Sequence, residues 1–585
     1  MTKLYLVLIE TSGNQNYIFS TNKLKENIGA SELTYRAGTQ WVLEAVGNVT
    51  GTKSLTVWKD SQRLRQQLLN SELNPAIEQP NVKVEVILAA SGKALLLTKT
   101  EEDAQSIIQQ VTRQALTEAP GLEVCGVFTE FDWDGDNLGE INRKVHHKYE
   151  QVRAQKPSTH LRFLRLPVAD QCATSGLPAN QLDSGPDADP LSAVAYSKRQ
   201  QSKAGIDRLV NIPQIYGAKE RLISSIDALE AKFEGFEGDD RLSWLAVIHA
   251  DGNGLGEIFL KFHHHLQALE PTPVHLNRSY IDHLRRFSIA LDICTERAFV
   301  TALSAFKPDS AGEISVVPLI LGGDDLTVVA DGRYALPFTH RFLEAFEQET
   351  QRNQAEVGDV ISQIAAQALG VGRLSACAGV AVIKPHFPFS VAYKLSEALM
   401  KSAKQVKRKV TNPVNPNQSY PCSALDFHIL YDSSNVELKR IRSLLELKQG
   451  DQTTYLYNRP YVTTPIGDLA SANHQDWAIF HHWQHLETRV RVLTALDEEG
   501  KRKLPNSQAH DLRSGLFLGK KEADARYALI RHRYRHRYGI QDIAELEGTP
   551  GSKSLFANEP GTEIAMTALM DAIDTADFLQ GAGHE

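Results

Sequence analysis

Two adjacent aspartates, Asp324 and Asp325, stand between two runs of strand-forming residues in the stretch LILGGDDLTVV. Glycine and aspartate are common in the tight turns of β-hairpins, so one interpretation of this stretch is a plain turn without chemistry. The other interpretation is a site that uses neighbouring carboxylates, which repel each other unless a cation lies between them. Other carboxylates at the same place in the fold would favour the second interpretation.

A third carboxylate, Asp251, ends another predicted strand in the stretch LSWLAVIHADGNGLGEIF. In a ferredoxin-like unit the first strand and the central hairpin are neighbours, so Asp251, Asp324 and Asp325 are expected at one sheet edge. Carboxylate oxygens suit Mg²⁺ or Mn²⁺. Two such ions ~3.5–4 Å apart can activate a ribose hydroxyl and stabilise a leaving pyrophosphate. The three aspartates are therefore the predicted catalytic residues and metal ligands.

Glycines around these aspartates are expected to bind nucleotide. Glycine has no Cβ, so its backbone can approach a phosphate or a ribose closely. The predicted nucleotide-binding glycines are Gly252, Gly254, Gly322 and Gly323. Asn253 is assigned to the same nucleotide-binding segment.

A basic segment, AYKLSEALMKSAKQVKRK, is helical by its spacing and carries Lys401, Lys404, Lys407 and Arg408. A cation near the sheet edge would neutralise triphosphate charge. The alternative for such a run is a solvated helix face. Only Lys404 is assigned to the predicted nucleotide site.

The chain repeats one order of predicted strands and helices. The hairpin VILAASGKALLL is similar to PLILGGDDLTVV, and strands and helices flank both in the same sequence. This indicates an internal duplication of a βαββαβ unit. The first copy has Ser91, Gly92 and Lys93 at the hairpin tip, so it is not expected to perform the same chemistry.

The predicted fold is α+β, with two ferredoxin-like palm domains and a C-terminal helical domain. The predicted domains are a first, non-catalytic palm (1–165), a loop-rich linker or insert (166–238), a catalytic palm (239–435) and a helical domain (436–585).

The composition is that of a globular protein rather than a membrane or disulfide-rich one. Hydrophobic residues make up 42% and charged residues 23%, and the net charge is -8. No apolar run approaches the ~20 residues that span a bilayer. The five cysteines form no CxxC pair, which supports neither a disulfide framework nor a zinc site. A cytoplasmic location without membrane contact is expected.

Several motifs together resemble a known family. Four segments occur in the order found in the palm domain of the large subunit of type III CRISPR effector complexes. They are HADGNGLGEIF, LILGGDDLTVV, GVAVIKPHFPFSVAYKLSEALMKSAKQVKRK and CSALDFHIL. SGNQNYIFSTNKLKENIGAS resembles the first, non-catalytic palm of that family. The palm is also similar to diguanylate cyclases, in which a lysine in the sequence AK contacts nucleotide phosphate. In this chain SAKQ gives that position to Lys404.

The resemblance implies an activity and its ligands. Members condense ATP into cyclic oligoadenylates, second messengers of prokaryotic antiviral defence, with two Mg²⁺ or Mn²⁺ ions. The 3′-hydroxyl of one ATP attacks the α-phosphorus of another, and the first palm holds the second nucleotide. Ser12, Lys23, Ser91 and Lys93 are the candidates for that role. Effector-complex subunits, guide or target RNA and a second copy of the chain are the implied partners.

The sequence departs from the family in two features. It begins directly at the first palm without an N-terminal His-Asp pair, and the insert keeps one cysteine, Cys172, where the family has zinc-binding pairs. Neither an HD nuclease nor a zinc site is therefore predicted, and a stand-alone relative is one form that the protein can take. Two alternatives stay open: a catalytically quiet scaffold or RNA-binding subunit, and a cyclase with a different cyclic nucleotide product.

Weaker features are interpreted as structural. The histidines of KFHHHLQ, His263 to His265, are expected on a solvated helix face. His481 and His485 are expected to be a packed or surface pair rather than metal ligands. The stretch RHRYRHRYG, starting at Arg531, mixes cations with aromatic residues. It fits either contact with RNA or nucleotide or packing of long side chains over a domain interface.

Overall fold

The structure, a computed structural model, describes residues 2–579 apart from 53–54, 56, 156, 158–160, 162, 164–165, 167, 184–187, 224–243, 272, 274, 311, 386, 432–435, 450–451 and 538–540. The three predicted domain boundaries, at residues 165, 238 and 435, lie outside the described residues. The boundaries therefore stay predictions.

The N-terminal part folds around an antiparallel sheet with the strand order β2-β3-β1-β4. This is the order of a ferredoxin-like unit, as the sequence predicts. The strands are β1 (Lys3–Ser12), β2 (Val84–Ala90), β3 (Lys93–Thr98) and β4 (Glu123–Asp132). The helices are α1 (Asn14–Phe19), α2 (Leu24–Gly38), α3 (Gln40–Thr50), α4 (Ser61–Leu69), α5 (Glu101–Glu118) and α6 (Leu138–Gln155).

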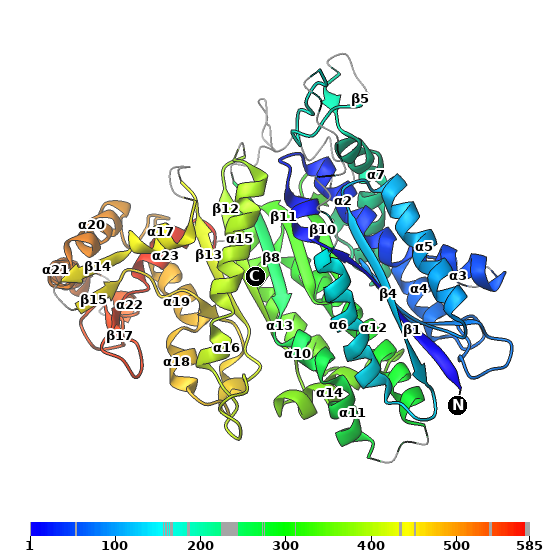
Figure 1. Cartoon of the computed structure of the whole chain (residues 1–585). Helices are drawn as coiled ribbons and strands as arrows, with labels where there is room; N and C mark the ends of the chain where they lie inside the picture. Colours follow the sequence, from blue (N-terminus) through cyan, green and yellow to red (C-terminus); the bar gives the residue numbers. More distant parts are fainter. Residues whose placement is uncertain are drawn as a thin grey trace.

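The second sheet has the order β10-β11-β8-β12-β13-β16, and its first four strands repeat the ferredoxin-like arrangement beside the first unit (Figure 1). Its strands are β8 (Leu245–Gly252), β10 (Val316–Gly322), β11 (Asp325–Asp331), β12 (Ala376–Ile383), β13 (Ala424–Ile429) and β16 (Tyr461–Val462). The helices of this unit are α10 (Leu255–Leu260), α11 (Phe262–Leu269), α12 (Leu276–Ala302), α13 (Ala335–Gln351), α14 (Val360–Leu369), α15 (Phe389–Ala403) and α16 (Val406–Lys409). The fold class predicted from the sequence, with two ferredoxin-like palms, is confirmed.

The two sheets repeat each other even in the irregularities of their hairpins. The ladder between β2 and β3 shifts register between Val86 and Leu88, and that between β10 and β11 shifts between Pro318 and Ile320. The skipped residue lies at the same distance from the turn in both hairpins. A bulge bends its strand and re-aims the residues beyond it, and the same irregularity precedes both hairpin tips.

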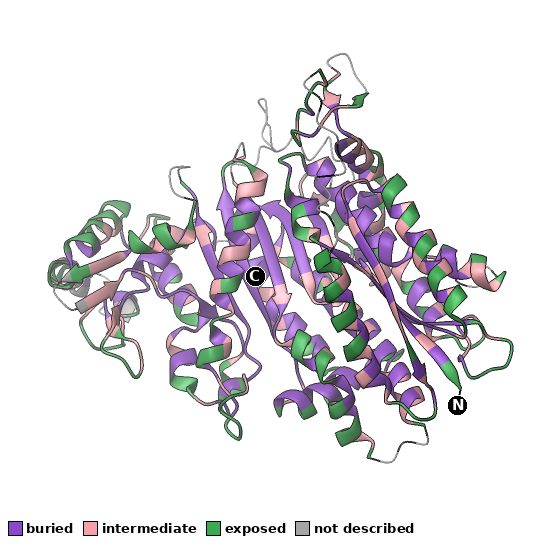
Figure 2. Cartoon of the chain, viewed as in Figure 1, coloured by how far each residue is buried: buried purple, intermediate pink, exposed green. Residues whose placement is uncertain are grey.

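The central strands of the second sheet are covered on both faces. Strand β12 is buried along its whole length. Strand β8 is buried at every residue except Asp251, which is half-buried. Such strands have nearly continuous apolar sequences because neither face meets water. Helices α12 and α13 pack on one face and α15 packs across β8, β12 and β13 on the other. Figure 2 shows these strands as buried and the outer helix faces as exposed.

The helix that carries the predicted site lysine ends earlier than the sequence suggests. The spacing predicts one continuous helix through AYKLSEALMKSAKQVKRK, but α15 ends at Ala403 and a separate short helix, α16, begins at Val406. Lys404 is the C-cap of α15. The interruption places Lys404 at a helix end, where a cation is favourable for the helix dipole.

The remaining segments lie outside the two palms. The insert contains β5 (Gln181–Leu182), β6 (Pro190–Leu191), α7 (Ala193–Val210), α8 (Ile212–Ile215) and β7 (Arg221–Leu222), while β9 (Glu313–Ile314) pairs with β7. The C-terminal part contains α17 (Leu438–Ser443), α18 (Gln475–Phe480), α19 (Trp483–Thr494), α20 (Asn506–Leu518), α21 (Lys520–Arg537), α22 (Gln541–Ala544) and α23 (Leu569–Thr575). It also has a small sheet, not predicted from the sequence, of β14 (Glu446–Gln449), β15 (Gln452–Tyr455), β18 (Ala565–Met566) and β17 (Ala557–Asn558).

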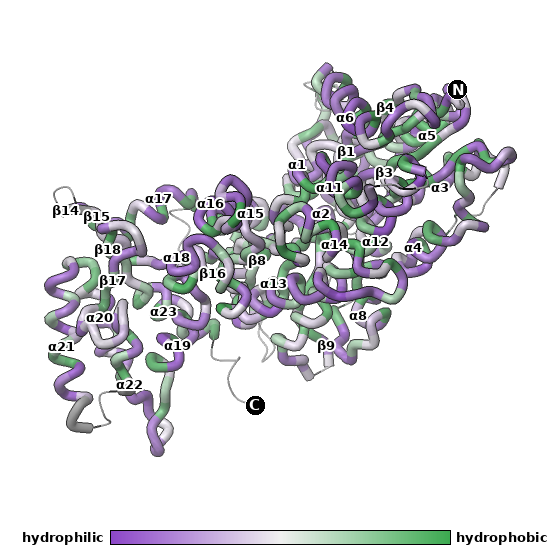
Figure 3. Tube along the Cα trace, turned by 90° about the horizontal axis from the view of Figure 1, so that it is seen from below, coloured by the Kyte–Doolittle hydropathy of each residue, from purple (hydrophilic) through white to green (hydrophobic). Residues whose placement is uncertain are grey.

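The C-terminal part lies at one end of the molecule, away from the first palm (Figure 3). Strand β16 joins it to the second sheet, because Leu425 and Tyr461 face each other in the β13–β16 pair. Within the described part of the chain, no helix has both the length and the apolar character needed to cross a bilayer.

Candidate active site

Three carboxylates meet where β8 ends beside the β10–β11 turn. Ala250 faces Leu326 in the antiparallel ladder, so the next residues along the two strands, Asp251 and Asp325, stand opposite each other. The carboxyl groups of Asp324 and Asp325 both lie close enough to Asp251 for its charge to act on them. All three residues are half-buried. The structure thus brings together the three predicted metal ligands from two distant segments.

Crowding and burial make the charged forms of Asp324 and Asp325 costly. Burial, followed by repulsion from Asp251, raises the pKa of Asp324 to about 7. Burial and the charges of Asp324 and Asp251 raise the pKa of Asp325 well above its usual value. A cation among them would remove this cost, and carboxylate oxygens are the donors that Mg²⁺ and Mn²⁺ prefer. The donor set therefore fits a divalent, oxygen-liganded cation.

Lys404 supplies a positive charge at the same place. Its ammonium group forms an ion pair with Asp251 and donates to the carbonyl of Gly252 at 3.2 Å. The neighbouring Lys401 instead pairs with Glu397 at 2.6 Å on the helix surface. The structure therefore separates the lysine assigned to the site from a lysine on the solvated face.

The glycines around the carboxylates have different structural roles. A Cβ on Gly252 would lie 2.8 Å from the Cβ and Oδ2 atoms of Asp324, so a larger residue would push the aspartate away. Gly254 has a φ of 76° and precedes α10. Gly323 has a φ of 61° at the first central position of the hairpin turn, as a type II′ turn requires. Gly322 pairs with Asp325 at the end of the ladder.

Asn253 lies in the same segment but its side chain faces the protein interior. Its amide nitrogen donates to the hydroxyl of Ser375 at 3.0 Å and to the carbonyl of Cys422 at 3.2 Å. Asn253 is buried. The structure thus places this predicted nucleotide-binding side chain among structural contacts rather than with the three carboxylates.

Helix α12 holds the turn that carries the aspartates. The backbone N–H of Gly323 donates to the carboxylate of Asp292, and the hydroxyl of Thr295 donates to the carbonyl of Gly323 at 2.6 Å. Neither residue is among those predicted from the sequence. No local motif marks Asp292 or Thr295, because only the packing of α12 beside the hairpin brings them to the turn.

A buried ion-pair network continues from α12 to the first palm. Arg65 of α4 donates to both carboxylate oxygens of Glu296, at 2.8 and 2.6 Å, and lies 3.9 Å from Asp292. The hydroxyl of Tyr216 also donates to Glu296, at 2.7 Å. Both Arg65 and Glu296 are almost fully buried. The geometry of the turn is therefore linked to the position of the first palm.

Aromatic rings join the two palms on the α15 side of the site. Phe19 of α1 stacks on Tyr393 of α15, with ring centroids 3.6 Å apart. The buried hydroxyl of Tyr393 has no hydrogen-bond partner among the described residues. Burial, and then the carboxylates of Glu397, Asp325 and Asp251, raise the pKa of Tyr393. Tyr393 therefore lies on the side of the carboxylates that faces the first palm.

The first palm has an ion pair where the second has its carboxylates. Glu10 faces Lys93 across the β1–β3 pair and Cys125 across the β1–β4 pair, just as Asp251 faces Cys377 across the β8–β12 pair. The Lys93 ammonium lies 3.1 Å from the Glu10 carboxylate. This substitution of a cation for a carboxylate removes the donor set for a divalent ion.

The four candidates for a second nucleotide on the first palm do not form one cluster. Ser12 donates to Glu123 at 2.9 Å and lines a cavity of about 460 Å³. Ser91 lines a small cavity shared with the second palm, and Lys93 lines another of about 310 Å³. Lys23 is exposed just before α2. Among the described residues, no hydrogen bond or ion pair joins any two of these four side chains.

Comparison with known proteins agrees with this geometry. Residues 244–411 match the family model of the second palm domain of Cas10/Cmr2. This segment is similar to the second palm domain of Cas10/Cmr2. It contains Asp251, Asp324, Asp325 and Lys404. No curated protein sequence matches the chain.

Solved structures similar to the chain have low sequence identity to it. A chain of the Csm1–Csm4 cassette in complex with cA4 has a TM-score of 0.48 and 10% identity, over 99% of this chain and 70% of that chain. A chain of the type III-B Cmr-beta complex in its apo state has a TM-score of 0.49 and 10% identity, over 98% of this chain and 82% of that chain. A chain of the Csm1–Csm4 cassette in complex with AMPPNP has a TM-score of 0.45 and 11% identity, over 99% and 70%.

Proposed function

We propose that the protein is a metal-dependent nucleotidyltransferase that condenses ATP into cyclic oligoadenylates. The observation that carries the proposal is the meeting of Asp251, Asp324 and Asp325 at the hairpin turn of a palm similar to that of Cas10/Cmr2. A scaffold has no need to hold three carboxylates so close together that the pKa values of Asp324 and Asp325 rise. An enzyme that binds divalent cations needs such a cluster.

Asp251, Asp324 and Asp325 would hold the ions in this proposal. Two bound Mg²⁺ or Mn²⁺ ions would activate the attacking hydroxyl and stabilise charge on the leaving pyrophosphate. The carboxylates must be ionised to act as ligands, so the raised pKa values of Asp324 and Asp325 make ion binding compete with protons.

Other residues of the palm would position the nucleotides. The 3′-oxygen of one ATP attacks the α-phosphorus of another, the bond from that phosphorus to the pyrophosphate oxygen breaks, and the hydroxyl proton is lost to water. Lys404 would balance phosphate charge beside Asp251. Gly252 and Gly254 would let the backbone approach ribose or phosphate.

The first palm would contribute to the nucleotide site and to assembly. Its helix α1 contacts α15 through the Phe19–Tyr393 stack, and Asn22 accepts hydrogen bonds from Ser390. The solved Csm1–Csm4 structures contain a partner subunit and nucleotides. We include an effector subunit, RNA and a nucleotide on the first palm among the proposed partners, with Ser12, Lys23, Ser91 and Lys93 as candidates.

The test is to incubate the purified chain with each nucleoside triphosphate, with and without Mg²⁺ or Mn²⁺, and to identify products by mass spectrometry. The proposal predicts oligoadenylates from ATP that require the metal ion. A cyclic product with another base would support the alternative cyclase. If an RNA-loaded complex makes no product but binds RNA with the palm intact, the scaffold alternative is favoured.

A further inference from the structure

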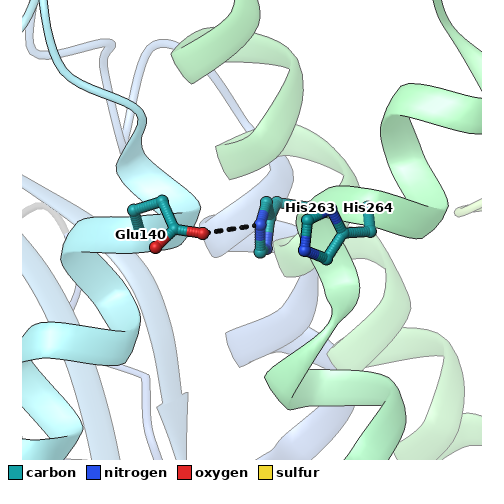
Figure 4. Close-up of side chains that lie close together, drawn as sticks. All are labelled: Glu140, His263 and His264. Carbon is teal, nitrogen blue, oxygen red and sulfur yellow. Dashed lines mark ion pairs between the residues drawn. The ribbon is translucent and has the colours of Figure 1, made fainter.

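A second cluster of possible metal ligands lies between the palms, away from the three aspartates. Glu140 of α6, in the first palm, faces His263 and His264 of α11, in the second (Figure 4). One ligand atom from each residue can be chosen so that all three lie within 4.8 Å of one another. The Nε2 atom of His263 is 2.9 Å from the Oε1 atom of Glu140. Two histidine nitrogens and a carboxylate oxygen are typical zinc ligands.

The structure corrects the prediction that His263 to His265 lie on a solvated helix face. The side chain of His263 is only 6% exposed, whereas His264 is exposed. His263 is buried because α11 packs against the first palm at this position, and no sequence pattern indicated that contact. The burial makes any unsatisfied ring nitrogen costly.

The close approach of α6 to α11 depends on a glycine. A Cβ on Gly139 would lie 2.4 Å from the Cβ of His263, a distance that no side chain tolerates. The start of α6 is held in place by Asn277 of α12, which accepts from the Leu138 N–H at 2.8 Å and donates to the carbonyl of Trp133 at 2.8 Å. Rigid backbone on both sides therefore sets the cluster, rather than flexible side chains meeting at the surface.

The buried Nε2 atom of His263 has a hydrogen-bonding capacity that the described residues do not satisfy. Although Glu140 is near, the contact does not have hydrogen-bond geometry, and Nε2 has no hydrogen-bond partner among the described residues. Arg143 pairs with the other carboxylate oxygen of Glu140, Oε2, and leaves Oε1 facing His263. A cation between Oε1 and Nε2 would satisfy both atoms.

We propose that Glu140, His263 and His264 bind a transition-metal ion of the Zn²⁺ class, with water in the remaining position. Imidazole nitrogens distinguish this donor set from the all-oxygen set of the aspartates, which suits Mg²⁺. The ligands come from both palms, so the bound ion would link α6 to α11 and stabilise the contact between the palms. This inference does not depend on the proposed activity.

The test is isothermal titration of the full chain with ZnCl₂, after removal of metals by a chelator and in excess Mg²⁺. Excess Mg²⁺ competes with Zn²⁺ for all-oxygen sites such as the three aspartates, so the remaining Zn²⁺ binding reports on the nitrogen-containing site. Losing an outer-shell partner already weakens metal binding by about 10–100-fold. We therefore expect Glu140→Gln and His264→Ala, both at solvent-accessible positions, to weaken Zn²⁺ binding by at least ~100-fold.

His265→Ala, on the same helix but outside the cluster, is the matched control and should bind like the wild type. Visible absorption of the Co²⁺-loaded chain reports on nitrogen coordination independently of affinity, and thermal melts without metal check that each variant is folded. Wild-type protein that binds no Zn²⁺, or binding equal in wild type, Glu140→Gln and His264→Ala, would overturn the proposal.

Discussion

Asp324 makes the stability of the metal-free protein depend on pH. Its pKa is about 7 in the folded protein, above its ordinary value of 3.8. Between about pH 4 and pH 7 the folded state therefore binds more protons than the unfolded state, and the free energy of unfolding falls as pH rises through this window. Below the window the carboxyl is protonated in both states and there is no penalty.

Asp324→Asn should remove much of this penalty. We expect the variant to be more stable than the wild type by about 1–3 kcal/mol at pH 8 in a chelator, and nearly equal to it at pH 4. Urea unfolding at the two pH values measures the difference. Asp189→Asn changes an exposed carboxylate and should have little effect. A variant that is less stable at pH 8 would show that Asp324 is held by favourable contacts instead.

Lys404 and Lys401 provide a comparison of two lysines at the same helix end. Lys404 contacts Asp251, whereas Lys401 contacts Glu397 at the surface. Removing one electrostatic contact from an active site costs about 10²–10³-fold in rate. Lys404→Met should therefore lower kcat/KM for ATP by about that factor, and Lys401→Met should change it less than about twofold. If both substitutions lowered kcat/KM equally, Lys404 would contribute only general positive charge and not a specific contact in the site.

Site residues can be predicted from the sequence where the residues that mark them lie within one short segment. The aspartates of the turn and Lys404 stand in recognisable local contexts, and the fold brings them together. Asn253 shows the limit, because its polar type and position between glycines suggest a ligand contact, whereas its amide is used by Ser375 and Cys422. The direction of a side chain depends on neighbours that the local sequence does not contain.

Among the secondary-structure elements, helix α12 determines the shape of the hairpin turn through its contact with it. Thr295 is fully buried and donates to the Gly323 carbonyl. Thr295→Val keeps the shape of the side chain but removes that hydrogen bond, which should cost about 1 kcal/mol of stability. If the transition state loses the same amount of stabilisation, activity should fall about fivefold, since 1.4 kcal/mol corresponds to tenfold in rate. Thr301→Val, exposed on the same helix, is the control for both measurements. Full activity of Thr295→Val would contradict the claim that α12 holds the turn in its active shape.

The approach of the β8 end to the turn depends on Gly252. An added Cβ would lie 2.4 Å from Leu255 Cδ1 and 2.8 Å from Asp324. Gly252→Ala should therefore lower stability by about 1–3 kcal/mol and displace Asp324. Gly256→Ala, where a Cβ meets nothing within 4 Å, should be neutral or stabilising. Denaturant unfolding and divalent-ion affinity measure the two consequences. A wild-type ion affinity in Gly252→Ala would contradict the close packing described here.

Elements formed by local pairing are the ones that the sequence predicts well. Both hairpins are expected from apolar runs around turn residues, and the duplication follows from their similarity. The end of α15 at Ala403 and the small sheet β14-β15-β18-β17 are not predicted. The β15–β18 pair joins Thr454 to Ala565, so its strands form only after distant segments meet.

The whole molecule links two palms of unequal chemistry. One palm has a carboxylate cluster, and the other has the Glu10–Lys93 ion pair at the equivalent position. Contacts such as Arg65–Glu296 and Phe19–Tyr393 join the palms. They connect residues far apart in the chain, and with one sequence no pattern indicates such pairs. The sequence therefore predicts the two domains but not the network between them.

The most direct test of the central claim is phosphodiester formation from ATP labelled at its α-phosphorus. The wild-type chain, with Mg²⁺ or Mn²⁺ and loaded with effector subunits and RNA, is compared with Asp324→Ala/Asp325→Ala in the same complex. A hairpin tip carries little of the core, so the double variant should fold and assemble normally. We predict labelled oligoadenylate from the wild type and none above background from the variant. Equal product from the two proteins, or no product from the assembled wild type, would contradict a catalytic role for the three aspartates.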